Sequence, residues 1–173
     1  MSLSERVGDT FAGGARGDEI AFLMFFYGTL KRGHRNHDAF CRDALRVQEA
    51  AVRGKLYDLP FGYPALVVPE EDVFAVGTAS PLRDAAEQRR LGHVFSHPAS
   101  GPRVFGELFA FDDPEARLPA LDRLEGFDPE DASSPYRRVL LPVETEGDSG
   151  VLAWAYVVAT ASGVHLPEGR WPA

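Results

Sequence analysis

Cysteine is nearly absent from this sequence: the 173 residues include one, Cys41. A single cysteine cannot form a disulfide within the chain, which excludes the disulfide frameworks of small secreted proteins. The chain also has no apolar run of about 20 residues that could span a bilayer. Its first residues lack the basic-then-apolar pattern of a secretory signal. We therefore expect a cytoplasmic protein with no membrane partner.

Positive charge is also scarce, since 18 Lys and Arg face 26 Asp and Glu, for a formal net charge of −8. Nucleic-acid binding requires clustered positive charge, so we expect no nucleic-acid partner. The stretch from Lys31 to Arg46 is a local exception, with five basic side chains and two acidic ones. It either guides a small anionic substrate or forms a solvated loop and helix face.

The length allows one domain, since single cores run to about 100–200 residues. We expect a tail over residues 1–20, which have no apolar period, and one domain over 21–173. Because the elements do not alternate as regular βαβ units, the pattern predicts an α+β fold with a sheet or a small barrel. Strands are predicted over 22–27, 52–59, 65–68, 73–76, 104–111, 136–143 and 151–159, and helices over 38–45, 82–91 and 115–125.

Two of these helices have clear start signals. Ser80 precedes Pro81, and Asp113 precedes Pro114, which is the order of a capping side chain followed by proline at the first helical position. Gly126 is typical of a helix end. These signals predict where the two helices begin and where the second one ends.

Glu125 is a carboxylate at a position where the helical pattern predicts burial. Measured from Leu118, Leu121 falls at about 300° and Glu125 at about 340° on the helical wheel, so all three share one face. Leu124 extends this stripe at about 240°. Burial raises the pKa of a carboxyl group, which prepares a general base that works near neutral pH. Alternatively, the side chain bends out to water at the helix end.

The first predicted strand ends in the turn Tyr27-Gly28-Thr29-Leu30. Glycine lets a ligand approach the backbone, and successive N–H groups in such a turn can hold an anion. Ligands often bind where strands end, because binding residues concentrate on the loops there. Taken alone the turn is a weak signal, since many strands end in a glycine turn.

Metal and nucleophile chemistry have weaker support. His34 with His37, and His93 with His97, are spaced as zinc ligands can be, but no helical His-Glu-x-x-His pattern accompanies them. We expect no metal site and no cofactor. Cys41 is interpreted as a small buried hydrophobe rather than a nucleophile. The sequence also lacks a Gly-x-Ser-x-Gly elbow, a phosphate-binding loop and a dinucleotide fingerprint.

Four motifs follow one another along the chain: Tyr27 to Gly33 followed by Asn36-His37, then Val104 to Phe109, Leu121 to Gly126, and Tyr136-Arg137-Arg138. In this order they resemble the gamma-glutamylcyclotransferase-like family, and the first resembles its gamma-glutamylamine cyclotransferase branch. The resemblance extends from about residue 24 to residue 158.

The resemblance implies a small mixed β-barrel flanked by a few helices and an activity that needs no cofactor. The substrate would be an L-gamma-glutamyl amine or gamma-glutamyl amino acid, cyclised to 5-oxoproline with release of the free amine. Glu125 would be the catalytic base, and the backbone of Tyr27, Gly28, Thr29 and Leu30 would hold the substrate. Tyr27 and Tyr136 would supply hydroxyl contacts or line the pocket.

Several alternatives stay open. The chain is either an enzyme or a non-catalytic module of the same fold that binds a small acyl or amino-acid ligand. It is either a monomer or a homodimer. Segment 72–101 is either a lid whose Arg83, Arg89 and Arg90 meet a substrate carboxylate, or a surface insertion.

Overall fold

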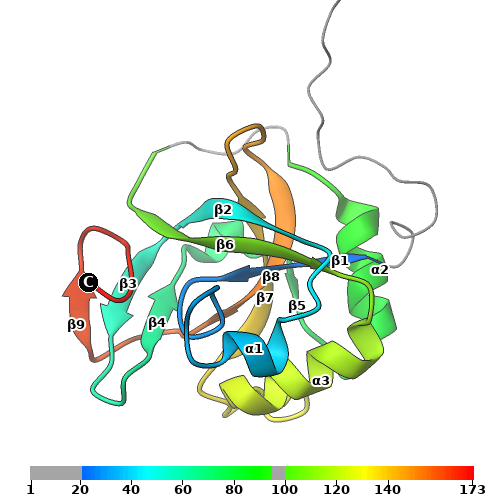
Figure 1. Ribbon diagram of the computed structural model, residues 1–173, viewed down its shortest axis with the longest axis horizontal. Helices are drawn as coiled ribbons and strands as arrows, with labels where there is room; N and C mark the ends of the chain where they lie inside the picture. Colours follow the sequence, from blue (N-terminus) through cyan, green and yellow to red (C-terminus); the bar gives the residue numbers. More distant parts are fainter. Residues whose placement is uncertain (1–20, 95–99) are drawn as a thin grey trace, which may run out of the picture.

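The computed structural model describes residues 21–94 and 100–173, so the expected tail over 1–20 and His97 lie outside the described residues. Two β-sheets and a few helices make up the described fold, which confirms the α+β class (Figure 1). In chain order the elements are β1 (Phe22–Phe26), α1 (His37–Phe40), β2 (Arg46–Arg53), β3 (Lys55–Asp58), β4 (Pro64–Val67), η1 (Glu70–Asp72), β5 (Ala75–Val76), α2 (Pro81–Leu91), β6 (Arg103–Phe111), α3 (Pro114–Glu125), β7 (Arg137–Val143), β8 (Val151–Val157) and β9 (Val164–Leu166).

The expected barrel is not closed. The larger sheet has the order β2-β6-β1-β8-β7-β5, and the smaller sheet has the order β4-β3-β9. Strand twist curls the larger sheet far enough for one bridge, between Ala51 of β2 and Glu144 just after β7. A closed barrel needs strands paired all the way round, and this bridge involves one residue on each side. Figure 1 shows the smaller sheet at the left of the view and α2 and α3 at the right.

Most predicted elements are confirmed to within a few residues. The helices at 81–91 and 114–125 begin at their prolines, and the Oγ of Ser80 accepts a hydrogen bond from the Arg83 N–H at 3.4 Å. Asp113 does not cap α3 with its side chain, because its carboxylate binds Arg117 Nε at 2.8 Å instead. Gly126 ends α3 in the left-handed conformation, with φ 71°.

Three predictions were wrong. The helix expected over 38–45 is the four-residue α1, and the single strand expected over 52–59 is the two strands β2 and β3. They separate at Gly54, where a Cβ would lie 2.7 Å from the Val67 carbonyl oxygen, so only glycine lets the chain cross between sheets there. The short strand β9 was missed.

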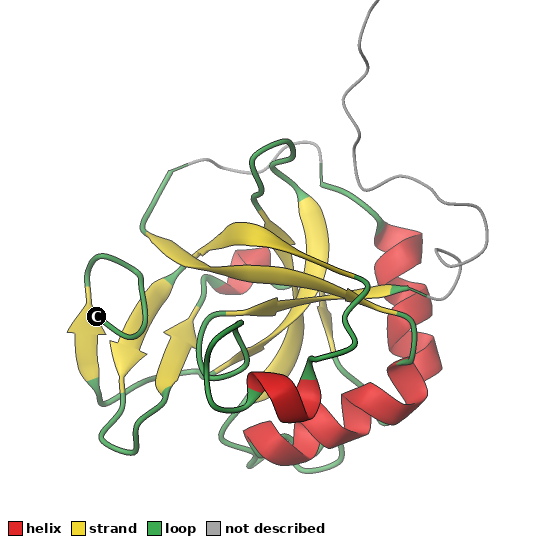
Figure 2. Ribbon diagram, viewed as in Figure 1, coloured by secondary structure: helices red, strands yellow, loops and turns green. Residues whose placement is uncertain are grey.

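Helices α2 and α3 pack against each other, and α2 also contacts β1 and β8 (Figure 2). Leu118 and Leu121 of α3 are buried in the core with Phe22 and Trp154, whereas Leu124 is 37% exposed and leaves the predicted stripe. In the described ranges, no helix has both the length and the apolar character needed to cross a membrane.

Candidate active site

A cavity of about 890 Å³ opens where β1, β8 and α3 end. Strands β1 and β8 run parallel, with Met24 beside Trp154, so their carboxyl ends reach the same edge of the sheet. Cavities of about 300–1,000 Å³ are typical small-molecule sites. All six residues predicted for the site line this cavity: Tyr27, Gly28, Thr29, Leu30, Glu125 and Tyr136.

Glu125 lies at the last residue of α3, on the cavity wall. Its side chain is partly buried and makes no hydrogen bond or ion pair with any residue in 21–94 or 100–173. Burial raises its pKa from the ordinary 4.5 to about 7. A carboxyl group with a pKa near 7 can both take and return a proton at neutral pH.

The turn after β1 lines the cavity and has backbone N–H groups that could serve a ligand. Among the described residues, no acceptor is bonded to the N–H of Gly28, Thr29 or Leu30. The carbonyls of this turn are engaged instead, because Gly28 O accepts from Lys31 N at 3.2 Å and Thr29 O accepts from Asn36 N at 3.0 Å. Three unbonded N–H groups in succession are suited to an anionic or carbonyl oxygen.

The structure gives a further reason for glycine at position 28. Gly28 has no positive φ, and the group that approaches it is the Pro64 ring. A Cβ at Gly28 would lie 2.8 Å from Pro64 Cγ and 2.9 Å from Cδ. Gly28 therefore lets the first residue of β4 close the cavity wall against the turn.

The tyrosine hydroxyls around the cavity donate to protein acceptors. Tyr27 donates to the Tyr156 carbonyl oxygen at 2.6 Å, Tyr136 donates to the Pro64 carbonyl oxygen at 3.1 Å, and Tyr156 donates to Asp122 Oδ1 at 2.6 Å. Burial raises the pKa of all three hydroxyls, and the negative charge of Glu125 contributes to each shift. Each phenol has one proton, so these oxygens can still accept but not donate.

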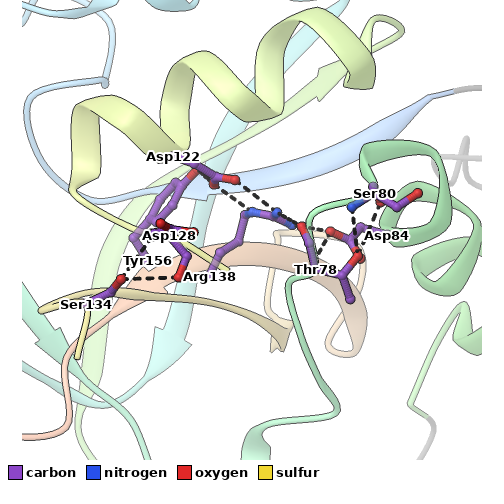
Figure 3. Close-up of polar contacts among 8 residues, drawn as sticks. All are labelled: Thr78, Ser80, Asp84, Asp122, Asp128, Ser134, Arg138 and Tyr156. Atoms are coloured by element: carbon purple, nitrogen blue, oxygen red, sulfur yellow. Dashed lines mark hydrogen bonds and ion pairs between the residues drawn. The ribbon is translucent and has the colours of Figure 1, made fainter. Parts of the chain in front are cut away.

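A buried ionic network supports this wall of the cavity, and sequence reasoning did not find it. The Arg138 side chain is fully buried; its Nε donates to Asp122 Oδ1 at 2.8 Å and its Nη1 to Asp84 Oδ2 at 2.9 Å. Figure 3 shows Arg138 between the two aspartates, with Tyr156 beside Asp122. The network joins β7, α2 and α3, one helical turn before Glu125.

Two signals in the sequence point to this network. Asp122 follows Leu118 by four residues, so it lies on the buried face of α3 as surely as Glu125 does. Arg138 is the second residue of β7, directly before an apolar run, at a position where the strand is buried. Gly77 carries a third signal that only the structure explains, because a Cβ there would lie 2.7 Å from the guanidinium carbon of Arg138.

The mouth of the cavity has residues that were not predicted for the site. They include Arg35, Arg123, Phe61 and Tyr63. Of the five basic residues in the stretch from Lys31 to Arg46, only Arg35 lines this cavity.

The described residues of the alternative metal and nucleophile sites have other contacts or are buried. In the described part of the chain, no three His, Cys, Asp or Glu side chains are placed to hold a metal ion. His37 Nδ1 lies 3.1 Å from the Leu30 carbonyl oxygen, His34 packs on Trp171, and His93 binds Asp148. Cys41 is buried, and burial raises the pKa of its thiol to about 12, as suits a structural cysteine.

Segment 72–101 does not cover the cavity in its described part, 72–94 and 100–101. None of these residues lines the cavity wall. Helix α2 packs on α3, and its Asp84 is buried against Arg138. Arg83, Arg89 and Arg90, which would meet a substrate carboxylate if the segment were a lid, are on this helix and do not line the cavity.

Comparison with known proteins gives the same family as the sequence motifs. The profile of the family described as "Gamma-glutamyl cyclotransferase, AIG2-like" matches residues 24–94 and 81–173. The Gamma-glutamylaminecyclotransferase of Bos taurus is 31% identical over 147 residues, which cover 83% of this chain and 71% of that protein.

Two solved structures share the fold. YkqA from Bacillus subtilis is 21% identical with a TM-score of 0.53; the match covers 87% of this chain but only 39% of YkqA. An AIG2-like protein from Mus musculus is 24% identical with a TM-score of 0.50, and the match covers 82% of this chain and 80% of that protein. At these identities the likeness concerns the fold.

Proposed function

Because the chain belongs to the gamma-glutamyl cyclotransferase, AIG2-like family, we propose that it cyclises an L-gamma-glutamyl amine or gamma-glutamyl amino acid to 5-oxoproline and releases the free amine. The proposal rests on one observation above all. Glu125, a partly buried carboxylate with a pKa of about 7 and no partner among residues 21–94 and 100–173, lies in the same cavity as the N–H groups after β1 that no described acceptor binds. The binding partner in this proposal is the small-molecule substrate. The cytoplasmic location stays a prediction from the sequence.

In the proposed reaction, the substrate's α-ammonium group binds next to Glu125. The Glu125 carboxylate removes one proton, and the resulting amine nitrogen attacks the substrate's own γ-carbonyl carbon. A carbon–nitrogen bond forms and closes the five-membered ring. The bond to the leaving amine then breaks as the proton held by Glu125 passes to the leaving nitrogen, and the ring nitrogen loses its second proton to the freed Glu125 carboxylate and from there to water.

The rest of the cavity orients the substrate. The N–H groups of Gly28, Thr29 and Leu30 would bind the α-carboxylate or the oxygen that becomes negative when the ring closes. The hydroxyl hydrogens of Tyr27 and Tyr136 are already in hydrogen bonds to backbone carbonyl oxygens, so the two hydroxyl oxygens would accept hydrogen bonds from the substrate's ammonium group. Ring closure within one molecule gains most from such orientation, because effective molarities can reach about 10⁵ M or more.

The direct test is incubation with several L-gamma-glutamyl compounds and detection of 5-oxoproline by mass spectrometry. Turnover by the parent protein and a loss of about 10²–10⁴-fold in Glu125→Gln would support the proposal, because the amide keeps the shape of the side chain but cannot act as a base. Arg89→Ala on exposed α2 is the control, since Arg89 is away from the cavity.

Two results would contradict the proposal. Full activity in Glu125→Gln would remove the proposed base. Binding of gamma-glutamyl compounds by calorimetry, without 5-oxoproline from any of them, would instead identify a non-catalytic binding module.

A further inference from the structure

Three charged side chains of the described residues line the cavity: Glu125, Arg35 and Arg123. Glu125 is partly buried, whereas both arginines are exposed. The cavity therefore has an inner part around Glu125 and a mouth that is bordered by positive charge.

Both arginines at the mouth are available for a ligand. Within residues 21–94 and 100–173, neither Arg35 nor Arg123 forms an ion pair, although most arginines of the described chain bind a carboxylate. The chain has 26 acidic residues against 18 basic ones, so protein partners for arginine are plentiful elsewhere. An anionic ligand group would find a partner at this mouth.

The same mouth has an aromatic wall. Phe61 is 71% exposed, and its ring lies 6.0 Å from that of Tyr63, centroid to centroid, at an interplanar angle of 24°. Arg35 reaches the same turn, because its Nη1 lies 3.5 Å from the place where a Cβ on Gly62 would be. A positive group and two stacked rings therefore border one part of the cavity.

The remaining question is which part of the substrate meets this wall. In the proposed function the γ-glutamyl group occupies the inner cavity, with its amine at Glu125 and its carboxylate or carbonyl at the turn after β1. A cavity of about 890 Å³ is large enough for a drug-sized ligand, so it has room for more than the γ-glutamyl group. The part of the substrate that extends toward the mouth is the leaving amine.

We infer that Arg35, Phe61 and Tyr63 form a subsite for the leaving amine, and that this subsite selects γ-glutamyl compounds whose amine portion carries both an apolar body and a carboxylate. This inference rests on the proposed function. Arg35 would bind the carboxylate, with bidentate geometry available, while the apolar body packs on the aromatic rings. Gamma-glutamyl derivatives of hydrophobic amino acids have this chemistry.

Four substrates separate the two contributions. L-gamma-glutamyl-L-phenylalanine has both groups, the phenethylamide of L-glutamate at its γ-carboxyl lacks the carboxylate, L-gamma-glutamylglycine lacks the ring, and the γ-methylamide lacks both. We expect kcat/KM of the parent protein to be about three- to tenfold higher for the phenylalanine compound than for the phenethylamide, as fits a solvent-accessible charge pair. Arg35→Ala brings this ratio close to one. Phe61→Ala lowers the ratio of the phenylalanine compound to the glycine compound.

Matched controls exclude effects of net charge and of surface area. Arg89→Ala removes the same charge from exposed α2, and Phe74→Ala removes an aromatic ring that is 42% exposed outside the cavity. Both controls keep the parent ratios. A ratio near one in the parent, or an unchanged ratio in Arg35→Ala, overturns the subsite while turnover of the methylamide upholds the proposed function. Absence of 5-oxoproline from all four compounds overturns both.

Discussion

The charged form of Glu125 lowers the stability of the folded protein, because the carboxylate is partly buried. Its pKa of about 7 in the folded protein lies above the ordinary 4.5, so the folded state holds the proton more tightly than the unfolded chain does. Folding stability therefore falls as pH rises from about 4.5 to about 7, and the loss is complete above pH 7. The loss of folding stability accompanies a carboxylate that is charged and unpaired above pH 7, and such a carboxylate is available for proton transfer.

We expect Glu125→Gln to stabilise the protein above pH 7, where the parent carboxylate is charged. A tenfold change in proton affinity corresponds to about 1.4 kcal/mol, so the rise in the Glu125 pKa from 4.5 to about 7 gives this stabilisation an upper value of roughly 3 kcal/mol. Urea unfolding of parent and variant at pH 5 and pH 8 measures it. A gain that is larger at pH 8 than at pH 5 supports the assignment, whereas equal differences at both pH values contradict it.

The same pKa predicts the pH dependence of turnover. General-base catalysis requires the charged carboxylate, so kcat/KM for a γ-glutamyl substrate should rise with pH through about 7 and then level off as far as Glu125 is concerned. A pH series from 5 to 9 on the parent protein measures this. A midpoint near 4.5 would mean that another group, or an unburied carboxylate, limits the reaction.

Gly28 allows a second test at the level of one residue. We expect Gly28→Ala to lower the free energy of unfolding by about 1–3 kcal/mol and to raise KM, because the added methyl group overlaps the Pro64 ring and moves the cavity wall. Gly147→Ala is the control, since a Cβ there has nothing within 4 Å and Gly147 has no positive φ. Equal stability of the two variants would show that Pro64 yields without cost.

Sequence reasoning found Glu125 but not Asp122, and the reason is physical. Both carboxylates fall on the buried face of one helix, so periodicity treats them alike. Their difference is tertiary: Arg138 and Tyr156, from two later strands, satisfy Asp122, while no described residue pairs with Glu125. A buried face therefore predicts candidate bases, and only the fold separates the paired carboxylate from the unpaired one.

At the scale of elements, Arg138 fixes how α2 and α3 sit against β7. We expect Arg138→Met to lower the free energy of unfolding by about 3–5 kcal/mol, because it leaves the buried carboxylates of Asp84 and Asp122 without their cation. Arg137→Met is the matched control. Arg137 pairs with Glu70, whose side chain is 72% exposed, and such exposed pairs contribute about 0–1 kcal/mol. Urea unfolding compares them, and equal losses would contradict the network's role.

Helices and strands that are marked in the sequence by proline, glycine or a long apolar run were predicted well, and those without such marks were not. Proline starts and glycine ends define α2 and α3, and long apolar runs define β1, β6 and β8. The first half of β2 has a polar, exposed face that resembles a helix surface in sequence. Strand β9 has three residues and pairs with β3 across more than 100 residues of chain, a contact that local pattern does not reveal.

At the scale of the whole molecule, the sequence predicted strands that could close a barrel but not whether they do. Closure depends on register and on the length of the edge strands, and β5 has only two residues. The two sheets are linked where Val158 N donates to the Leu66 carbonyl oxygen at 2.9 Å, and again by the chain after β9. There, Phe105 N of β6 donates to the Gly169 carbonyl oxygen at 2.8 Å, and Trp171 Nε1 donates to Asp58 Oδ1 of β3 at 2.9 Å.

Gly169 lies against β6 of the larger sheet, in the segment after β9. We call this segment, residues 167–173, the strap. Gly169 has φ 67°, and a Cβ there would meet the Arg103 carbonyl oxygen, so alanine would be opposed both by backbone conformation and by a rigid neighbour. Gly33 isolates the first effect, with φ 82° and nothing within 4 Å, and Gly147 has neither. We expect little change in the free energy of unfolding for Gly147→Ala, a loss of about 1 kcal/mol for Gly33→Ala, and a clearly larger loss for Gly169→Ala. Thermal and urea unfolding of the three variants would measure this order. Equal losses for Gly33→Ala and Gly169→Ala would mean that the strap can lift from β6 without cost and that the two sheets do not depend on it.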